Sequence, residues 1–437
     1  MSASSFRMEK ACGMDGHGAF LVLSVAVRIV ARVSRYRLRP TPVQERGLLE
    51  HCKQARFVWN LAVEQHTHWR PGREGAPGFA EQCRQLTEAR AAFPWLRCGS
   101  VIVQQQALKD FAQAMANFFA GTHRHPTWRK AGRHEGFRIV AVRPGDARRL
   151  SRHVGEVKIP KVGWVRFRWS RPVPAEVKSY RVTLDHAGRW HVAFAAIPDP
   201  VPAPGNGHAV GVDRGVAVSA ALSTGELLHA PGLTSGEAGR LLRLQRRLAR
   251  ARRGSNRRAR LKAAIARLKA READRRRDWV DKTTTSLARD FDVIAVEDMD
   301  VRSMTRSARG TIGEPGRRVA QKAGLNRGIL AHGWGAVLQR LEHKAPGRVV
   351  KVRSAYTSQR CSACGIVNRD SRESQAVFRC RSCGHADNTD VNAAINIRTA
   401  AGHAVAARGA LQPLGGARKR EPQPDLLCVG RTVGIPF

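Results

Sequence analysis

Four cysteines in the C-terminal part of the chain have the spacing of a metal site. Cys361 and Cys364 form one C-x2-C pair, and Cys380 and Cys383 form a second pair fifteen residues later. Two such pairs present four thiolates, which close a tetrahedron around Zn2+ and leave no open coordination position. The spacing therefore predicts one structural zinc ion. A disulfide or a redox C-x-x-C pair is the weaker alternative, because two correctly spaced pairs occur together.

Three acidic residues stand where a strand ends or a helix begins. Asp213 and Glu297 each end a short apolar run, and Asp390 precedes a helical segment. Carboxylates at such ends can converge on one edge of a sheet, where they could hold two Mg2+ ions roughly 3.5–4 Å apart for phosphodiester chemistry. For any one acid, a turn or cap role is the more common explanation. The neighbouring Asp298 and Asp300 show that position alone does not choose among the acids.

Strands and a basic helical hairpin must position these acids. Residues 208–228 predict two strands around a turn, and residues 291–296 and 347–352 predict two further buried strands. Residues 240–277 are helical, with 17 Arg or Lys against two acids, and Gly254-Ser255-Asn256 breaks them into a hairpin. Because so few acids offset this charge, a surface that faces phosphates is favoured over a solvated coiled coil.

The first half of the chain changes from helical to strand-forming patterns. Its apolar positions recur with a helical period up to about residue 119, and alternating segments follow from Gly136 to Pro198. Asp185 to Gly188 predicts a hairpin turn, and the Pro/Gly-rich segment 199–207 predicts a linker. The expected elements before the alternating segments are a strand over 34–38 and helices over 43–66, 78–92 and 100–119.

The charge of the chain points to a polyanionic partner. Its 437 residues include 76 Lys or Arg against 35 Asp or Glu, a formal net charge of +41. Such a surplus repels itself in isolation, and nucleic acid is the polyanion that best balances it. Mere solubility is the weaker explanation. The length is enough for two or three domains.

Other features argue against a membrane or secreted protein. No apolar run reaches the roughly 18 residues of a membrane span. Residues 19–27 are the nearest, and we assign them to an N-terminal extension or an upstream start codon rather than to a signal peptide. The other five cysteines are scattered, which favours a reducing, cytosolic setting over a disulfide framework.

These residues together resemble the TnpB (OrfB) family of insertion-sequence proteins, relatives of the type V CRISPR effectors. GVDRGV is similar to the first motif of a RuvC-like nuclease, and VIAVEDMDVRSM is similar to the second. TSQRCSACG, FRCRSCG and DNTDVNAAINI resemble the zinc insertion and the third motif. The resemblance covers about residues 34–400. It implies that Asp213, Glu297 and Asp390 are the catalytic ligands of two Mg2+ ions and that Cys361, Cys364, Cys380 and Cys383 bind Zn2+.

The resemblance also implies a fold. It is α/β with β-barrel and helical parts, in two lobes: an RNase H-like (RuvC) nuclease domain with a zinc-ribbon insertion, and a β-barrel wedge domain with an inserted helical recognition lobe. The implied layout is an N-terminal extension, disordered or mis-started (1–32), the first wedge strand (33–45), the recognition lobe (46–135), the wedge barrel (136–199), a linker (200–207), the nuclease domain (208–352), the zinc ribbon (353–386), the last nuclease motif and helix (387–400) and a disordered tail (401–437).

The activity that the resemblance implies is RNA-guided cleavage of DNA by a Mg2+-dependent endonuclease of a transposable element. The guide RNA would come from the transposon end and would read the target by base pairing. The protein would read only a short motif beside the target in double-stranded DNA. No small-molecule cofactor is expected. The expected location is the bacterial cytoplasm, with nucleoid association when the protein binds DNA.

Three further residues are expected to contact nucleic acid. Gln104 and Gln105 lie on a helix that in the family is near the target-adjacent motif, and glutamine can bond base edges. A solvated helix face is an equal alternative for both. Arg327, in the segment GLNRGI, matches a family segment beside the nuclease site and would neutralise a phosphate.

Two other functions stay open at this point. An RNA-guided DNA-binding or transposition accessory protein would bind its target without cutting it, although the complete set of three carboxylates weighs against this. A type V CRISPR-like effector would work with a repeat-spacer array, and the neighbouring DNA would decide between an array and a transposon end.

Overall fold

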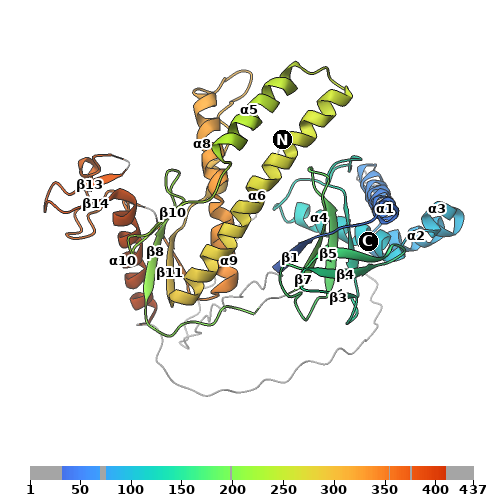
Figure 1. Cartoon of the computed structure of the whole chain (residues 1–437), viewed down its shortest axis with the longest axis horizontal. Helices are drawn as coiled ribbons and strands as arrows, with labels where there is room; N and C mark the ends of the chain where they lie inside the picture. The colour runs from blue at the N-terminus through green and yellow to red at the C-terminus, as the bar shows by residue number, and fades with distance from the viewer. Residues whose placement is uncertain (1–31, 69–74, 197–198, 354, 375, 410–437) are drawn as a thin grey trace, which may run out of the picture.

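The computed structural model describes residues 32–68, 75–196, 199–353, 355–374 and 376–409 (Figure 1). Figure 1 shows two groups of elements, one from each half of the chain, with a long helix of the second half leaning toward the first. The expected N-terminal extension, apart from Arg32, and residues 410–437 of the expected tail lie outside the described residues.

The first long helix begins at a capping residue. After the strand β1 (Arg32–Arg37), the helix α1 (Pro42–Thr67) starts at Thr41, whose side chain accepts a hydrogen bond from the backbone N–H of Gln44 at 3.3 Å. The Gln44 side chain accepts in return from the Thr41 N–H at 3.0 Å. This capping box satisfies donors that a helix start leaves free. The helices that follow are α2 (Phe79–Ala92), α3 (Pro94–Arg97) and α4 (Val101–Phe119).

Two antiparallel sheets complete the first half. One has the strand order β1-β7-β6-β2 and the other β3-β4-β5. The Tyr180 hydroxyl donates to the Lys158 carbonyl at 2.7 Å and joins the sheets. The predicted hairpin turn is confirmed, since the Asp185 side chain accepts from the backbone of Ala187 and Arg189. The strands are β2 (Gly136–Val140), β3 (Ala147–Arg149), β4 (Val154–Ile159), β5 (Gly163–Arg168), β6 (Ser179–Leu184) and β7 (Trp190–Ala196).

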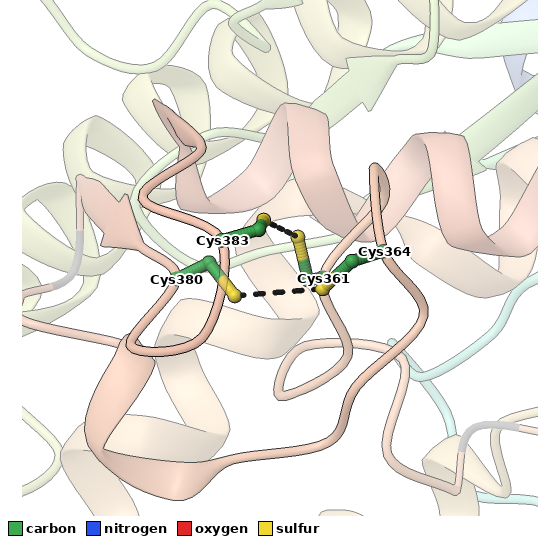
Figure 2. Close-up of side chains that lie close together, drawn as sticks. All are labelled: Cys361, Cys364, Cys380 and Cys383. Carbon is green, nitrogen blue, oxygen red and sulfur yellow. Dashed lines mark hydrogen bonds between the residues drawn. The ribbon is translucent and has the colours of Figure 1, made fainter.

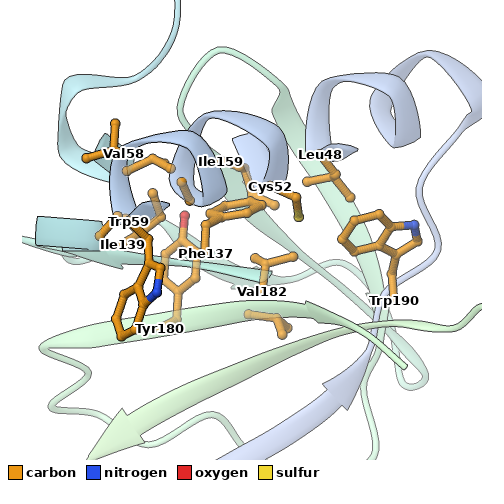
Figure 3. Packing of buried hydrophobic residues seen from close by; sticks show 14 of the residues in the cluster. Leu48, Cys52, Val58, Trp59, Phe137, Ile139, Ile159, Tyr180, Val182 and Trp190 are labelled. Atoms are coloured by element: carbon orange, nitrogen blue, oxygen red, sulfur yellow. The ribbon is translucent and has the colours of Figure 1, made fainter. Parts of the chain in front are cut away.

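One hydrophobic core joins the helices and strands of the first half. Leu48 and Cys52 of α1 pack with Phe137, Val182 and Trp190 of the strands (Figure 3). Burial of apolar surface is the main stabilising contribution to such packing. The expected boundary between a helical lobe and a β-barrel at residue 135 is therefore not a boundary between two cores.

The second half is built on a mixed sheet. Its strands are β8 (Ala209–Asp213), β9 (Ala220–Leu222), β10 (Leu227–Leu228), β11 (Val293–Glu297) and β12 (Val349–Val352). The order is β10-β9-β8-β11-β12, with β8, β11 and β12 parallel and β9 antiparallel to both of its neighbours. The predicted buried strands are confirmed, and this arrangement agrees with the expected RNase H-like domain.

Helices cover both faces of this sheet. Val280 and Leu341 pack with Val210 on one face, while Ile397 packs with Val350 on the other. This two-sided cover explains why the parallel strands are continuous apolar runs. The helices are α5 (Ser235–Arg250), α6 (Asn256–Asp290), α7 (Val301–Met304), α8 (Val319–His332), α9 (Trp334–Lys344) and α10 (Thr389–Gly409).

Two helices are longer than the sequence pattern predicts. The basic hairpin, expected over 240–277, begins at Ser235 and continues to Asp290, because its last turns bury Leu287 against the sheet. α10 passes the expected start of the tail at 401, because Ala401 is buried in the core on the other face. Tertiary packing extends both helices. Within the described ranges, no helix is long and apolar enough to cross a membrane.

Candidate active site and cysteine cluster

Two of the predicted carboxylates end neighbouring parallel strands. β8 and β11 pair in register, and Asp213 and Glu297 are the last residues of each. They therefore lie at the same edge of the sheet. Asp390 is the second residue of α10. Its carboxylate approaches the chain that follows β8, since a Cβ built on Gly215 would lie 3.8 Å from Asp390 Oδ2.

The three carboxylates share one poorly solvated environment. Glu297 and Asp390 are each only 7% exposed, and Asp213 is half-buried. Burial, followed by the charges of Glu297 and Asp390, raises the pKa of Asp213 to about 7. Burial also raises the pKa of Asp390. A buried carboxylate whose ionisation is disfavoured by neighbouring carboxylates, as at Asp213, is typical of a functional site that a cation completes.

These residues fit hard divalent cations. Carboxylate oxygens are the donors that Mg2+ prefers, and a bound cation would offset the repulsion at Asp213. Among the described residues, the four cysteines are the only group of three or more His, Cys, Asp or Glu whose ligand atoms all lie within 4.8 Å of one another. The carboxylates of Asp213, Glu297 and Asp390 are not such a group among these residues.

A buried chain of hydrogen bonds orients Glu297. The Thr357 hydroxyl donates to Glu297 Oε1 at 2.6 Å. Asn396, on α10, donates in turn to the Thr357 carbonyl at 2.9 Å and to the Arg360 carbonyl at 2.7 Å. The helix that carries Asp390 is therefore bonded to the segment that holds Glu297. Such outer contacts keep metal-binding carboxylates in place.

Arg214 lies directly behind the carboxylates. Its side chain is 4% exposed, and its guanidinium donates to the Glu297 carbonyl and, at 3.4 Å, to the Trp334 carbonyl. Burial lowers the pKa of Arg214, and the charges of Glu297 and Asp213 oppose that shift. Arg214 thus ties the end of β11 to the first residue of α9.

The four cysteines converge as their spacing predicts (Figure 2). The Sγ atoms of Cys361 and Cys383 lie 3.7 Å apart, and so do those of Cys364 and Cys380. Zn–S bonds of about 2.3 Å at tetrahedral angles place sulfurs about 3.8 Å apart, so this cluster has the size of a zinc site. Backbone N–H groups of Cys383 and then Ser382 lower the pKa of Cys380 to about 6. A backbone N–H of His385 acts to lower the pKa of Cys383, but the neighbouring thiols together raise it to about 12, so Cys380 is the first of these two to form a thiolate.

The turns of the cluster require glycine at two positions. Gly365 and Gly384 follow the second cysteine of each pair and have φ angles of 78° and 73°. This left-handed conformation is strained for residues with a Cβ. It lets the Gly365 N–H bond the Cys361 carbonyl at 3.0 Å. The local sequence therefore prepares each pair of thiols before any metal binds.

The cysteine cluster is joined directly to the helix that carries Asp390. The strand β13 (Val377–Arg379) pairs with β14 (Ala386–Asn388), and α10 begins at the next residue. The Asn388 side chain accepts from the backbone N–H of Asp390 at 3.0 Å. The ribbon therefore fixes the first turn of α10, as its position in the sequence suggests.

Two of the residues expected to contact nucleic acid, Gln104 and Gln105, lie on α4 in the half of the chain without the carboxylates, and one of them is buried. Gln104 is 0% exposed, accepts from Arg90 at 2.5 Å, and donates to Gln54 at 3.1 Å. The expectation that Gln104 faces a base is wrong for this structure, because packing of α4 uses its amide internally. Gln105 is half-buried, and Arg327 is exposed on α8.

Three residues around the carboxylates were not predicted from the sequence: Arg214, Thr357 and Asn396. Each lies within a segment already assigned to a motif, so the local pattern was visible. Their roles depend on which side chains are buried together, and no spacing within one segment reveals that.

Comparisons with known proteins agree with this fold. The family model described as "Probable transposase" matches residues 191–308, "Helix-turn-helix domain" matches 30–74, and "Cas12f1-like, TNB domain" matches 334–397. The chain is 36% identical to "Putative RNA-guided DNA endonuclease InsQ" of Escherichia coli (strain K12), over 89% of this chain and 96% of that protein. It is 31% identical to "Putative RNA-guided DNA endonuclease" of Streptomyces pristinaespiralis, over 87% and 91%.

A solved structure shares the fold. The Cas12f1–sgRNA–target DNA complex superposes with a TM-score of 0.51 at 13% identity, covering 81% of this chain and 82% of that one. The mixed sheet with acidic residues at its strand ends thus has the fold class of the RuvC-like nucleases. Within that class, the chain belongs to the TnpB/OrfB family of insertion-sequence proteins.

Proposed function

We propose that this chain is an RNA-guided DNA endonuclease of a transposable element. The observation that carries the proposal is the meeting of Asp213, Glu297 and Asp390 at one edge of the sheet, where burial and mutual repulsion raise the pKa of Asp213 to about 7. Relatives that the chain matches over most of their length are named as RNA-guided DNA endonucleases. A repressor that only binds DNA would have no need of this acidic cluster.

The three carboxylates would hold two Mg2+ ions. When bound, the ions would activate a water molecule and stabilise the leaving oxygen of a phosphodiester. Thr357 keeps the Glu297 carboxylate oriented, and Asn388 keeps the start of α10 in place under Asp390. Cys361, Cys364, Cys380 and Cys383 would hold one Zn2+ ion, which serves the shape of the ribbon alone.

The partners in this proposal are a guide RNA from the transposon end and double-stranded target DNA. The chain has 76 basic residues against 35 acidic ones, and this excess of positive charge supports binding of both polyanions. The basic hairpin of α5 and α6 would contribute to that surface. The first half of the chain would correspond to the wedge domain and recognition lobe, and the site of action would be the bacterial cytoplasm, at the nucleoid when the protein binds DNA.

The test is to purify the full chain expressed with the DNA that flanks its gene and to sequence the bound RNA. A defined RNA that ends at the transposon boundary is expected, together with Mg2+-dependent cutting of a matched DNA duplex. Asp213→Ala should abolish cutting and leave RNA binding intact. Asp298→Ala is the matched control, because Asp298 is an exposed acid one residue beyond Glu297.

Four results would overturn the proposal. Cutting by the Asp213→Ala variant would show that the site assignment is wrong. Absence of any RNA with a defined end would contradict guidance by RNA. Binding of a matched target without cutting, in the presence of Mg2+, would favour an accessory protein, and an RNA copied from a repeat-spacer array would favour a CRISPR-like effector.

A further inference from the structure

Arg214 brings a fixed positive charge into the acidic site. It follows Asp213 in the chain, is 4% exposed, and reaches the carbonyl of Glu297. In the described part of the chain, its guanidinium bonds backbone carbonyls instead of either carboxylate. The guanidinium therefore leaves the carboxylate oxygens to other partners, such as the Thr357 hydroxyl at Glu297 Oε1, while the charge of Arg214 acts on Glu297 and Asp213.

Such an arrangement costs folding energy. A buried guanidinium loses its hydration, and carbonyl groups replace only part of it. The Nε atom of Arg214 is buried without a hydrogen-bond partner. An apolar side chain would fill the same space at a smaller cost, so the charge itself is the property that needs an explanation.

The charge changes how many cations the site attracts. The guanidinium offsets part of the negative charge of Asp213 and Glu297, so the site attracts a first divalent ion strongly but has less charge left for a second. Arg372 offsets part of the charge of Asp390, but it stands on the ribbon and is half-exposed, so solvent screens its charge. Arg214 is shielded from water and is therefore the stronger influence.

We propose that Arg214 is a positioning residue that sets the metal loading of the site: one divalent ion binds to the protein alone, and the second binds only with the negatively charged phosphodiester of the substrate. The inference rests on the proposed function, because it takes the carboxylates as the metal ligands. The metal-bound protein without DNA would therefore hold only one of its two ions. DNA that is not correctly placed would then escape cutting.

The test is a titration of the zinc-loaded full chain, free of nucleic acid, with Mn2+, followed by electron paramagnetic resonance. Asp213→Asn supplies the background of sites elsewhere on the protein. The wild type should bind one Mn2+ above this background. Arg214→Gln, which removes the charge and is two bonds too short for the Glu297 carbonyl, should bind the first ion about tenfold more tightly or take up a second ion. If Arg214 only supports the fold, Arg214→Gln should instead bind Mn2+ more weakly than the wild type.

Arg214→Lys separates charge from shape. Lysine keeps the charge but cannot reach both carbonyls, so the melting temperature should fall while the Mn2+ affinity stays within about twofold of the wild type. The inference would be overturned if Arg214→Gln bound Mn2+ no more tightly than the wild type. It would also be overturned if Arg214→Lys lost Mn2+ affinity in proportion to its loss of stability. If the wild type binds no Mn2+ above the Asp213→Asn background, the carboxylate site of the proposed function fails instead.

Discussion

Gly211 lies directly against the backbone of α10 at Ala394. A Cβ built on Gly211 would stand 1.9 Å from the Ala394 carbonyl oxygen and 2.7 Å from the Arg398 nitrogen. Gly211 is two residues before Asp213, and Ala394 is one helical turn after Asp390. This close crossing of β8 and α10 therefore sets the separation of two of the candidate metal ligands.

Gly211→Ala should push α10 away from the sheet. Backbone atoms cannot give way as a flexible side chain would, so the free energy of unfolding should fall by about 1–3 kcal/mol. A displacement of Asp390 by about 1 Å should slow DNA cutting by about a hundredfold. Urea denaturation and single-turnover cleavage would measure the two effects. Gly236→Ala is the matched control, since nothing lies within 4 Å of that position in α5, and both quantities should stay the same or rise slightly.

Thr357→Val should weaken Mg2+ binding at the carboxylates without changing the shape of the side chain. Valine removes the hydroxyl that donates to Glu297 Oε1 and fills nearly the same volume. Loss of such an outer contact typically lowers metal affinity or activity by about 10–100-fold. The expected result is a higher Mg2+ concentration for half-maximal cutting, with RNA binding unchanged. Thr357→Ser keeps the donor and should restore the wild-type Mg2+ dependence; a Ser variant as weak as Val would contradict the role of the hydroxyl.

Asp213 should make the metal-free protein less stable as pH rises. The pKa of Asp213 is about 7 in the folded protein, above its ordinary value of 3.8, so the folded state holds a proton that the unfolded chain releases. The stability from this group is therefore complete below about pH 4 and is lost as pH rises to about 7. Asp213→Asn should gain on the order of 1–2 kcal/mol over the wild type at pH 7.5 in the presence of a chelator of Mg2+.

Urea denaturation at pH 5.5 and 7.5 would measure that difference. The advantage of Asp213→Asn should be smaller at pH 5.5, where the wild-type carboxyl is mostly protonated. Asp298→Asn serves as the control and should show no comparable change between the two pH values, because Asp298 is exposed. An equal advantage at both pH values would show that the pKa of Asp213 is not raised in the folded protein.

Cys361→Ser should disturb the ribbon first and cutting second. Cys361 is 1% exposed and packs with Phe378, so loss of its thiolate opens both the metal site and the small core beside it. The expected results are less than one zinc per chain by elemental analysis, faster proteolysis of the ribbon, and cutting reduced by about tenfold or more because Asp390 is no longer held. Cys98→Ser, at an exposed cysteine outside the cluster, should leave all three unchanged. Full cutting by a zinc-free Cys361→Ser protein would show that the active site does not depend on the ribbon.

The cysteine cluster could be predicted from the sequence because its ligands are local. Each C-x2-C pair forms within one turn, and Gly365 and Gly384 supply the backbone conformation that the turn needs. The two pairs are fifteen residues apart, so little chain has to fold before they meet. The buried strands are local in the same sense, and their prediction was confirmed.

The active site depended on contacts between distant segments. Strand ends and family resemblance singled out Asp213, Glu297 and Asp390, but only the parallel register of β8 with β11 and the crossing at Gly211 bring these carboxylates together. Periodicity likewise placed Gln104 on a helix without showing which face would be buried. The role of Arg214 could not be predicted for the same reason. Its burial behind Glu297 follows from the packing of α9 against the sheet, which the sequence does not show. Spacing along the chain determines which groups can form a site locally, and tertiary packing decides which distant groups share it and which lose contact with water.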